Sequence, residues 1–74
     1  MTLTLTQKTQ IITLALNAFK LNSKEAQFGI QVLCEFVGLN LISLANWVVS
    51  NDADTVVSAE NWSSEEFFEK FGNK

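Results

Sequence analysis

The sequence predicts an all-α fold, a small bundle of three main helices with a short aromatic helix at its C-terminal end. Two observations predict it. Proline is absent and glycine occurs only three times in 74 residues, so few residues interrupt a helix. Side chains that cap helices recur in front of apolar stretches with helical spacing. We expect a single helical domain over residues 1–74, because a chain of this length holds one core.

The first helix is expected to begin near Thr4 or Thr6. Thr4 and Gln7 have the spacing of a capping box, in which each side chain binds the backbone amide of the other residue. The residues that follow are mostly apolar, with one narrow polar stripe. The stripe consists of Gln10, Thr13, Asn17 and Lys20. So narrow a stripe predicts a helix covered on more than one side, and it is a first indication of a partner.

A short break at Asn22 and Ser23 predicts a tight turn into a second helix, from Lys24 to about Val37. Both residue types cap helices, and Glu25 lies where the helix dipole favours an anion. The residues expected to face solvent are Lys24, Gln27, Gln31 and Glu35. The residues expected to face inward are Ala26, Phe28, Ile30, Leu33, Phe36 and Val37.

Gly38 decides where the second helix ends. As a C′ glycine it ends that helix, and Asn40 then caps a third helix from Leu41 to Val49. The alternative is one helix from Lys24 to Ser50 that tolerates the glycine at a cost of about 1 kcal/mol. We prefer the break, because so long a helix would carry more apolar surface than the rest of the chain can cover.

Residues 51–61 allow two interpretations. A polar turn over residues 51–54, between two pairs of β-branched valines, is typical of a short hairpin. Alternatively, Asp54 caps a helical turn that runs through Ala59. We favour a loop and a short helix, because an isolated two-stranded hairpin is only marginally stable.

The last segment carries the clearest local signal. Ser63 and Glu66 have the spacing of a capping box at the start of a helix. Trp62 and Phe67 have the spacing of a hydrophobic staple at the same end. Gly72 is expected to end this helix as a C-terminal glycine. We therefore predict a helix from Ser64 to Phe71.

Residues 30–48 resemble a helix-turn-helix. That motif has a small residue packed between its two helices, a glycine four positions later, and apolar residues at set offsets in the second helix. The matching residues are Cys34, Gly38, Leu39, Leu44 and Trp47, with Asn40 as the cap. The resemblance implies a helix-turn-helix-like centre of the fold, and a DNA-binding regulator as one possible function.

The residues that DNA binding requires are missing from this segment. Residues 39–50 contain no cation, and no lysine lies between Lys24 and Lys70. Arginine is absent, and the net charge is −3. Phosphate contacts provide most of the affinity for DNA, so we do not expect a nucleic-acid partner.

Catalysis, cofactors and metals are not expected either. Histidine and tyrosine are absent, and the paired carboxylates at residues 52 and 54 and at 65 and 66 are better explained by a turn and a helix start. Cys34 is the only cysteine, which excludes an intramolecular disulfide and a cysteine zinc site. We expect a buried, unreactive thiol, because free cysteine usually behaves as a small hydrophobic residue.

A membrane or secreted location is not expected. Residues 30–49 have the length of a span but contain Glu35 and three amide side chains. The N-terminal residues make a poor signal peptide. We therefore expect a cytoplasmic protein.

These exclusions leave a small acidic protein that binds other proteins, as an accessory factor or an inhibitor. Its expected interaction residues are Trp62, Phe67, Phe68 and Phe71, since aromatic side chains are common anchors of interfaces. A homodimer is also expected, because a chain this short without a disulfide or a metal often needs a second subunit. The alternatives are a degenerate helix-turn-helix regulator and a helical sponge that holds a small ligand between protomers.

Overall fold

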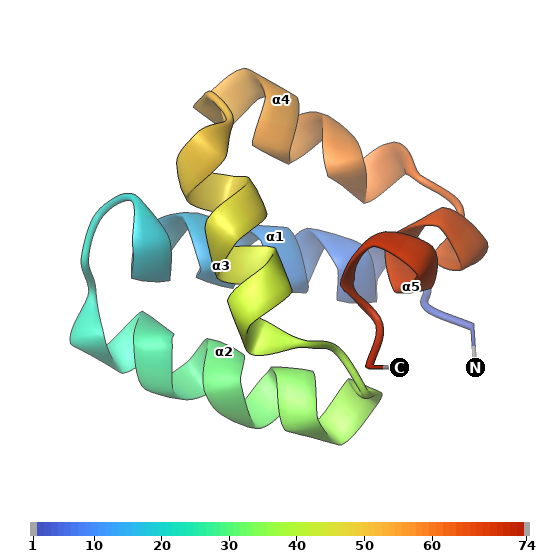
Figure 1. The fold of residues 1–74 in the computed structure, drawn as a ribbon, viewed down its shortest axis with the longest axis horizontal. Helices are drawn as coiled ribbons and strands as arrows, with labels where there is room; N and C mark the ends of the chain where they lie inside the picture. Colours follow the sequence, from blue (N-terminus) through green and yellow to red (C-terminus); the bar gives the residue numbers. More distant parts are fainter. Residues whose placement is uncertain (1, 74) are drawn as a thin grey trace.

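Five α-helices and one 3-10 helix make up the computed structural model, which describes residues 2–73 (Figure 1). The elements are α1 (Leu5–Phe19), α2 (Lys24–Val37), α3 (Leu41–Ser50), α4 (Ala53–Ser58), η1 (Ala59–Asn61) and α5 (Ser64–Phe71). Within the described range the only extended pairing is one isolated bridge. The predicted all-α fold is confirmed.

Both predicted capping boxes are present. The amide of Gln7 donates to the Thr4 hydroxyl at 3.1 Å, and the Thr4 amide donates to the Gln7 side chain at 2.8 Å. At α5, the amide of Glu66 donates to the Ser63 hydroxyl at 3.2 Å, and the Ser63 amide reaches the Glu66 carboxylate at 3.5 Å. Because these contacts join residues three apart, the sequence alone was enough to place α5 at Ser64–Phe71.

Gly38 ends α2, as predicted, and separates it from α3. Its φ of 82° lies in the left-handed region, and its amide donates to the Cys34 carbonyl at 2.9 Å. Asn40 then caps α3 by accepting from the Ser43 amide at 2.9 Å. The break divides the apolar run of residues 30–49 between two helices. Among residues 2–73, no helix has the length and apolar character that a membrane span requires.

The region after α3 is helical and contains no hairpin. The prediction that Asp54 caps this helix is wrong, because the cap is Asp52, which accepts from the Thr55 amide at 2.7 Å. Asp54 lies in the first turn of α4, where the helix dipole favours its charge. Helix α4 continues directly into η1, and both end at Trp62, whose backbone is extended.

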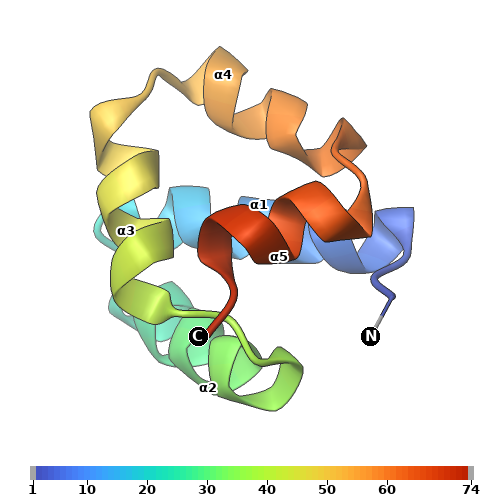
Figure 2. The same ribbon diagram turned by 45° about the vertical axis from the view of Figure 1, so that its right-hand side comes forward.

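Helix α1 forms the centre of the arrangement. It lies between α2 and α4 in both views, and it also contacts α3 and η1 (Figures 1 and 2). Its buried apolar residues are Ile11, Ile12, Ala15 and Ala18. The narrow polar stripe of α1 is therefore explained by neighbours in the same chain, and it needs no second chain.

The segment after α5 pairs with the turn between α2 and α3. The amide of Asn40 donates to the Phe71 carbonyl at 2.6 Å, and the amide of Asn73 donates to the Gly38 carbonyl at 3.0 Å. Gly72, which lies between them, ends α5 as predicted, in an extended conformation at φ −68° and ψ 152°. A Cβ at Gly72 would lie 2.3 Å from the Phe68 carbonyl oxygen, so close packing explains this glycine.

Gly38→Ala is expected to lower the free energy of unfolding by about 1–2 kcal/mol, because an L side chain is strained at positive φ even where space is free. Gly29→Ala is the matched control. Its Cβ would meet only the Leu14 side chain at 3.6 Å, so we expect no loss, or a gain of up to about 1 kcal/mol in helix propensity. Urea denaturation measures both, and equal losses would contradict this account.

Asp52 is expected to give stability a small dependence on acid pH. Hydrogen bonds from the side chain and then the backbone of Thr55 hold the pKa of Asp52 below its ordinary value of 3.8. A lowered folded pKa means that this stabilisation is present above the ordinary pKa and is lost as pH falls through the folded pKa. Asp52→Asn keeps the cap without titrating. Thermal melts from about pH 5 to about pH 2 should therefore show a steeper loss for the wild type than for this variant.

Candidate functional site

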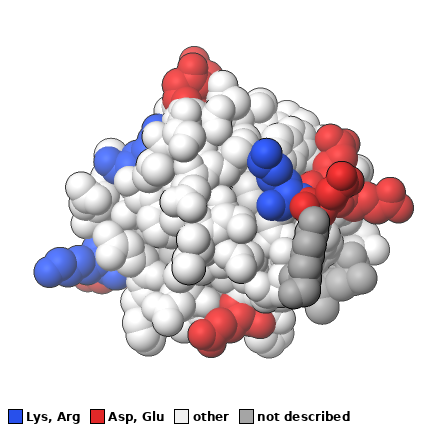
Figure 3. Space-filling view, in the orientation of Figure 1, with Lys and Arg blue, Asp and Glu red and all other residues white. Residues whose placement is uncertain are grey.

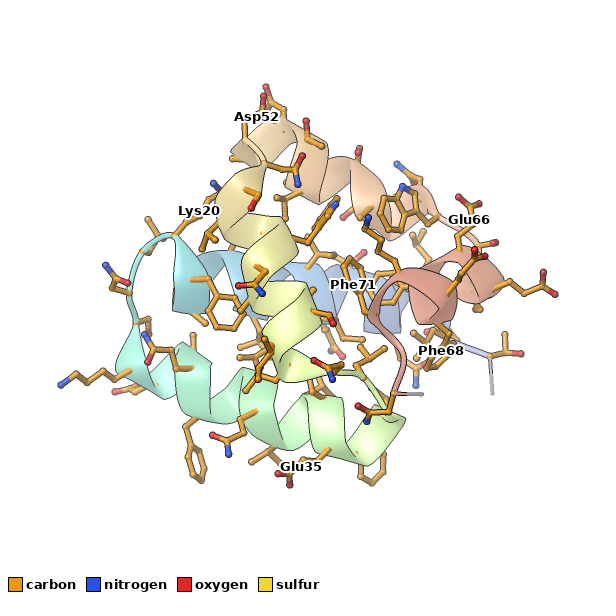
Figure 4. All side chains as sticks on the ribbon, in the orientation of Figure 1. Lys20, Glu35, Asp52, Glu66, Phe68 and Phe71 are labelled. Carbon is orange, nitrogen blue, oxygen red and sulfur yellow. The ribbon has the colours of Figure 1, made fainter. Side chains whose placement is uncertain are left out.

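The four aromatic residues predicted as an interaction site lie in two different environments. Phe67 and Phe71 are completely buried, whereas Trp62 and Phe68 are partly buried and pack against the core. In Figure 4 the labelled Phe71 points into the molecule from α5. Phe67 and Phe71 therefore have no surface to offer a partner, and only Trp62 and Phe68 stay candidates.

The buried rings form one aromatic cluster that fixes α5. The ring centroids of Phe67 and Phe71 are 5.1 Å apart in an edge-to-face arrangement, and Trp62 stacks on Phe71 at 5.8 Å. Trp47, from α3, meets Trp62 at 5.2 Å and Phe71 at 5.3 Å. Trp62 also contacts Phe67 at 6.4 Å, so the predicted staple is present. Such pairs add about 0.5–1.5 kcal/mol each beyond their burial, which makes this cluster a stabilising element.

Lys8 contacts the backbone of one member of this cluster, Trp62. Its side chain is buried, and its amine donates to the carbonyl oxygen of Trp62. The contact ties α1 to the turn before α5. The sequence contained no sign of it, because the two residues are 54 positions apart.

A band of exposed apolar side chains lies on α2. Phe28, Val32 and Phe36 follow one another at intervals of four residues and are 72%, 50% and 81% exposed. Four residues advance about 40° around a helix, so the three side chains form one continuous band. We call this band the α2 stripe. The prediction that Phe28 and Phe36 face the core is wrong.

The geometry of α2 explains this error. The buried residues of the helix are Ala26, Ile30, Cys34 and Val37, which form a second apolar arc. This arc lies about 150° from the α2 stripe around the helix axis. Since α2 has neighbours on one side only, one of its two apolar arcs is left exposed. The predicted polar positions Lys24, Gln27, Gln31 and Glu35 are exposed as expected.

A groove runs beside the α2 stripe, between α2 and α1. Its volume is about 580 Å³, and it is open to solvent on one side. Its walls are Thr9, Gln10, Thr13 and Leu14 from α1 and Gly29, Val32, Leu33 and Phe36 from α2. Val32 and Phe36 belong to both the stripe and the groove, so the two features form one surface. We call this surface the α1–α2 face.

The charges near the α1–α2 face lie on its border. None of the groove-lining residues is charged. Lys24 lies at the N-terminal end of α2 and Glu35 near its C-terminal end, and both are exposed. Figure 4 shows Glu35 pointing away from the body of the molecule. The groove is therefore apolar and neutral, Lys24 and Glu35 lie along one flank of the face, and the exposed Glu25 lies in line with the α2 stripe at its N-terminal end.

A second hollow, of about 310 Å³, lies on α5. Its lining residues are Trp62, Glu66, Glu69 and Lys70. Three of these four residues are charged, so this hollow offers much less apolar surface than the α1–α2 face. Because Trp62 is partly exposed in this hollow, it remains an alternative contact site.

The helix-turn-helix-like pair α2–α3 presents no basic surface. The exposed residues of α3 are Ile42, Ser43, Asn46, Val49 and Ser50. The few lysine side chains on the face in Figure 3 are separated from one another, and most of that face is uncharged. Nothing in the described residues of α3 therefore provides the phosphate contacts of a DNA-reading helix.

The side chains available for metal binding or nucleophilic chemistry do not gather in one place. Residues 2–73 contain no group of three or more metal-binding side chains that could hold an ion together. Cys34 is buried in α2, and burial raises the pKa of its thiol to about 11. A thiol with so high a pKa is a poor nucleophile at neutral pH.

Comparison of the chain with protein-family models, with curated proteins and with solved structures found no match. The class of protein therefore follows from the fold and the surface alone. It is a small all-α protein with an exposed apolar face on α1 and α2.

Reaction of the wild type with a thiol-specific disulfide reagent is expected to be slow at pH 8 and fast once the chain is unfolded. The cause is burial, which both blocks access to Cys34 and keeps its thiol protonated, since the pKa of about 11 lies well above the assay pH. The measurement is the rate of thiolate release with and without denaturant. Rapid stoichiometric reaction of the folded protein would contradict a buried, unreactive thiol.

Proposed function

We propose that this chain is a protein-binding domain that acts by contact, as an accessory factor or an inhibitor, and that the α1–α2 face is its binding surface. The observation that carries the proposal is the exposure of Phe28 and Phe36 beside an apolar groove. Two phenylalanines on one face of a helix are costly to leave in water. Their position next to a groove is typical of a surface that a partner covers.

The neutral groove supports a protein partner over the other classes of ligand. A nucleic acid needs cations, and the groove has none among its lining residues. A small ligand is usually enclosed on most of its surface, whereas this groove is open along one side. A helix or an aromatic side chain of another protein matches both its shape and its neutrality.

The remaining parts of the proposal concern chemistry and location. We propose binding without catalysis, cofactor or metal, since the described residues contain no group of three or more metal-binding side chains and the pKa of the buried Cys34 thiol is raised to about 11. A buried free thiol is compatible with a reducing compartment, which supports a cytoplasmic location. The exposed parts of Trp62 and Phe68 on α5 are the alternative contact site.

The double variant Phe28→Ser/Phe36→Ser tests the proposal in a pull-down from host lysate with quantitative mass spectrometry. We expect the wild type to enrich a specific protein and the double variant to lose it. Two anchors of an interface together account for a weakening of about 30-fold or more. Both side chains are exposed, so the variant should fold normally, and circular dichroism checks this.

Two controls locate the contact. Leu21→Ser/Val57→Ser removes two other exposed apolar side chains, 73% and 42% exposed, and should leave the capture intact. Phe68→Ala tests α5 and should also leave it intact. Loss of capture in Phe68→Ala with retention in Phe28→Ser/Phe36→Ser would move the site to α5. Equal losses in all three variants would indicate non-specific adhesion and contradict the proposal.

A further inference from the structure

We infer that the partner of the α1–α2 face is a second copy of this chain, bound with α2 antiparallel to α2 about a two-fold axis near Val32. The inference rests on the proposed function, because it names the occupant of the same surface. Three observations carry it: the self-complementary shape of the face, its apolar area, and the order of charges along its border.

The shape of the face is self-complementary, as a two-fold interface requires. Such an interface uses the same patch on both copies, so the patch must contain both a projection and a hollow. Phe28 projects from α2 and does not line the groove, whereas Gly29, the next residue, leaves space in the groove wall. A two-fold axis near Val32 places Phe28 of each copy beside Phe36 of the other, at the groove. Each copy then fills the hollow of its partner.

The apolar area agrees with the size of a stable dimer. A phenylalanine side chain buries about 150–250 Å², so the exposed fractions of Phe28, Val32 and Phe36 correspond to roughly 400 Å² of apolar surface per copy. A standard interface buries about 800 Å² per partner, of which a little over half is apolar. The α2 stripe alone thus supplies about the apolar share of such an interface. The groove walls and border residues supply the polar remainder.

The border charges select the antiparallel orientation. Lys24 and Glu35 are eleven residues apart, which is close to three helical turns, so they lie within about 20° of each other around α2. A two-fold axis between antiparallel helices brings the same flank of both copies together. With the axis at Val32, Lys24 of each copy is offset from Glu35 of the other by five residues, about 7.5 Å along the helix, so the two long side chains reach toward each other across the border. A parallel arrangement would instead bring lysine beside lysine and glutamate beside glutamate.

The first experiment is sedimentation equilibrium on the purified full chain. We expect a reversible dimer for the wild type and for the control Leu21→Ser/Val57→Ser, and a dissociation constant at least about 30-fold higher for Phe28→Ser/Phe36→Ser. A monomeric wild type at every concentration would overturn the inference. So would a dimer that Phe28→Ser/Phe36→Ser leaves unchanged, because its interface would lie elsewhere.

Two further variants test the orientation. Lys24→Glu should weaken the dimer several-fold at low salt, and Lys24→Glu/Glu35→Lys should restore it, because both interfacial pairs are then re-formed with reversed sign. Val32→Cys should give a covalent dimer under mild air oxidation, whereas Leu21→Cys should not, since only position 32 lies near its symmetry mate. Failure of both the charge rescue and the Val32→Cys cross-link would overturn the antiparallel arrangement.

The outcome also separates this inference from the proposed function. A chain that stays monomeric, yet captures a different protein through Phe28 and Phe36 in the pull-down, would overturn the self-association and support protein binding. A monomer that captures nothing through these residues would overturn both. A wild-type dimer whose affinity depends on Phe28, Phe36 and the Lys24–Glu35 order would support both.

Discussion

The burial of α1 on several sides is the constraint on which the rest of the structure depends. A chain of this size has one core, and α1 provides the surface against which α2, α3, α4 and η1 pack. Its small residues Ala15 and Ala18 are completely buried, so neighbouring helices approach it closely. Because α1 takes the central place, the other helices lie at the periphery with one side toward solvent (Figures 1 and 2).

The exposed apolar stripe of α2 is a direct consequence of that arrangement. α2 carries two apolar arcs, and α1 together with α3 can cover only one of them. The covered arc contains smaller side chains such as Ala26 and Cys34, which allow close packing, whereas the uncovered arc contains Phe28 and Phe36. Burying the larger rings inside would have gained more apolar area per residue. Their exposure therefore supports a surface that is completed by another chain.

The helix-turn-helix-like centre serves as a packing unit in this protein. The turn at Gly38–Asn40 is held by hydrogen bonds to the segment that follows α5, so the turn, α3 and the aromatic cluster stabilise one another. In a DNA-binding protein the exposed side of the second helix would be rich in polar and basic residues. Here the exposed residues of α3 are uncharged. The shared geometry of helix, turn and helix thus carries no evidence for DNA binding.

The sequence by itself determined ends of α1, α2 and α5, because their signals are local, whereas it left residues 51–61 open between a hairpin and a short helix. Capping contacts join residues three apart, and a left-handed glycine needs only the conformational freedom of that residue, so Thr4, Gly38 and Ser63 were sufficient to place three helix ends. Only the tertiary structure decided which arc of α2 faces inward and which aromatic rings of α5 are buried. Both choices depend on which surface α1 and α3 present at long range, and helical periodicity is the same whichever apolar arc is covered. For that reason the sequence placed the interaction site on α5, whereas the exposed apolar face lies on α2.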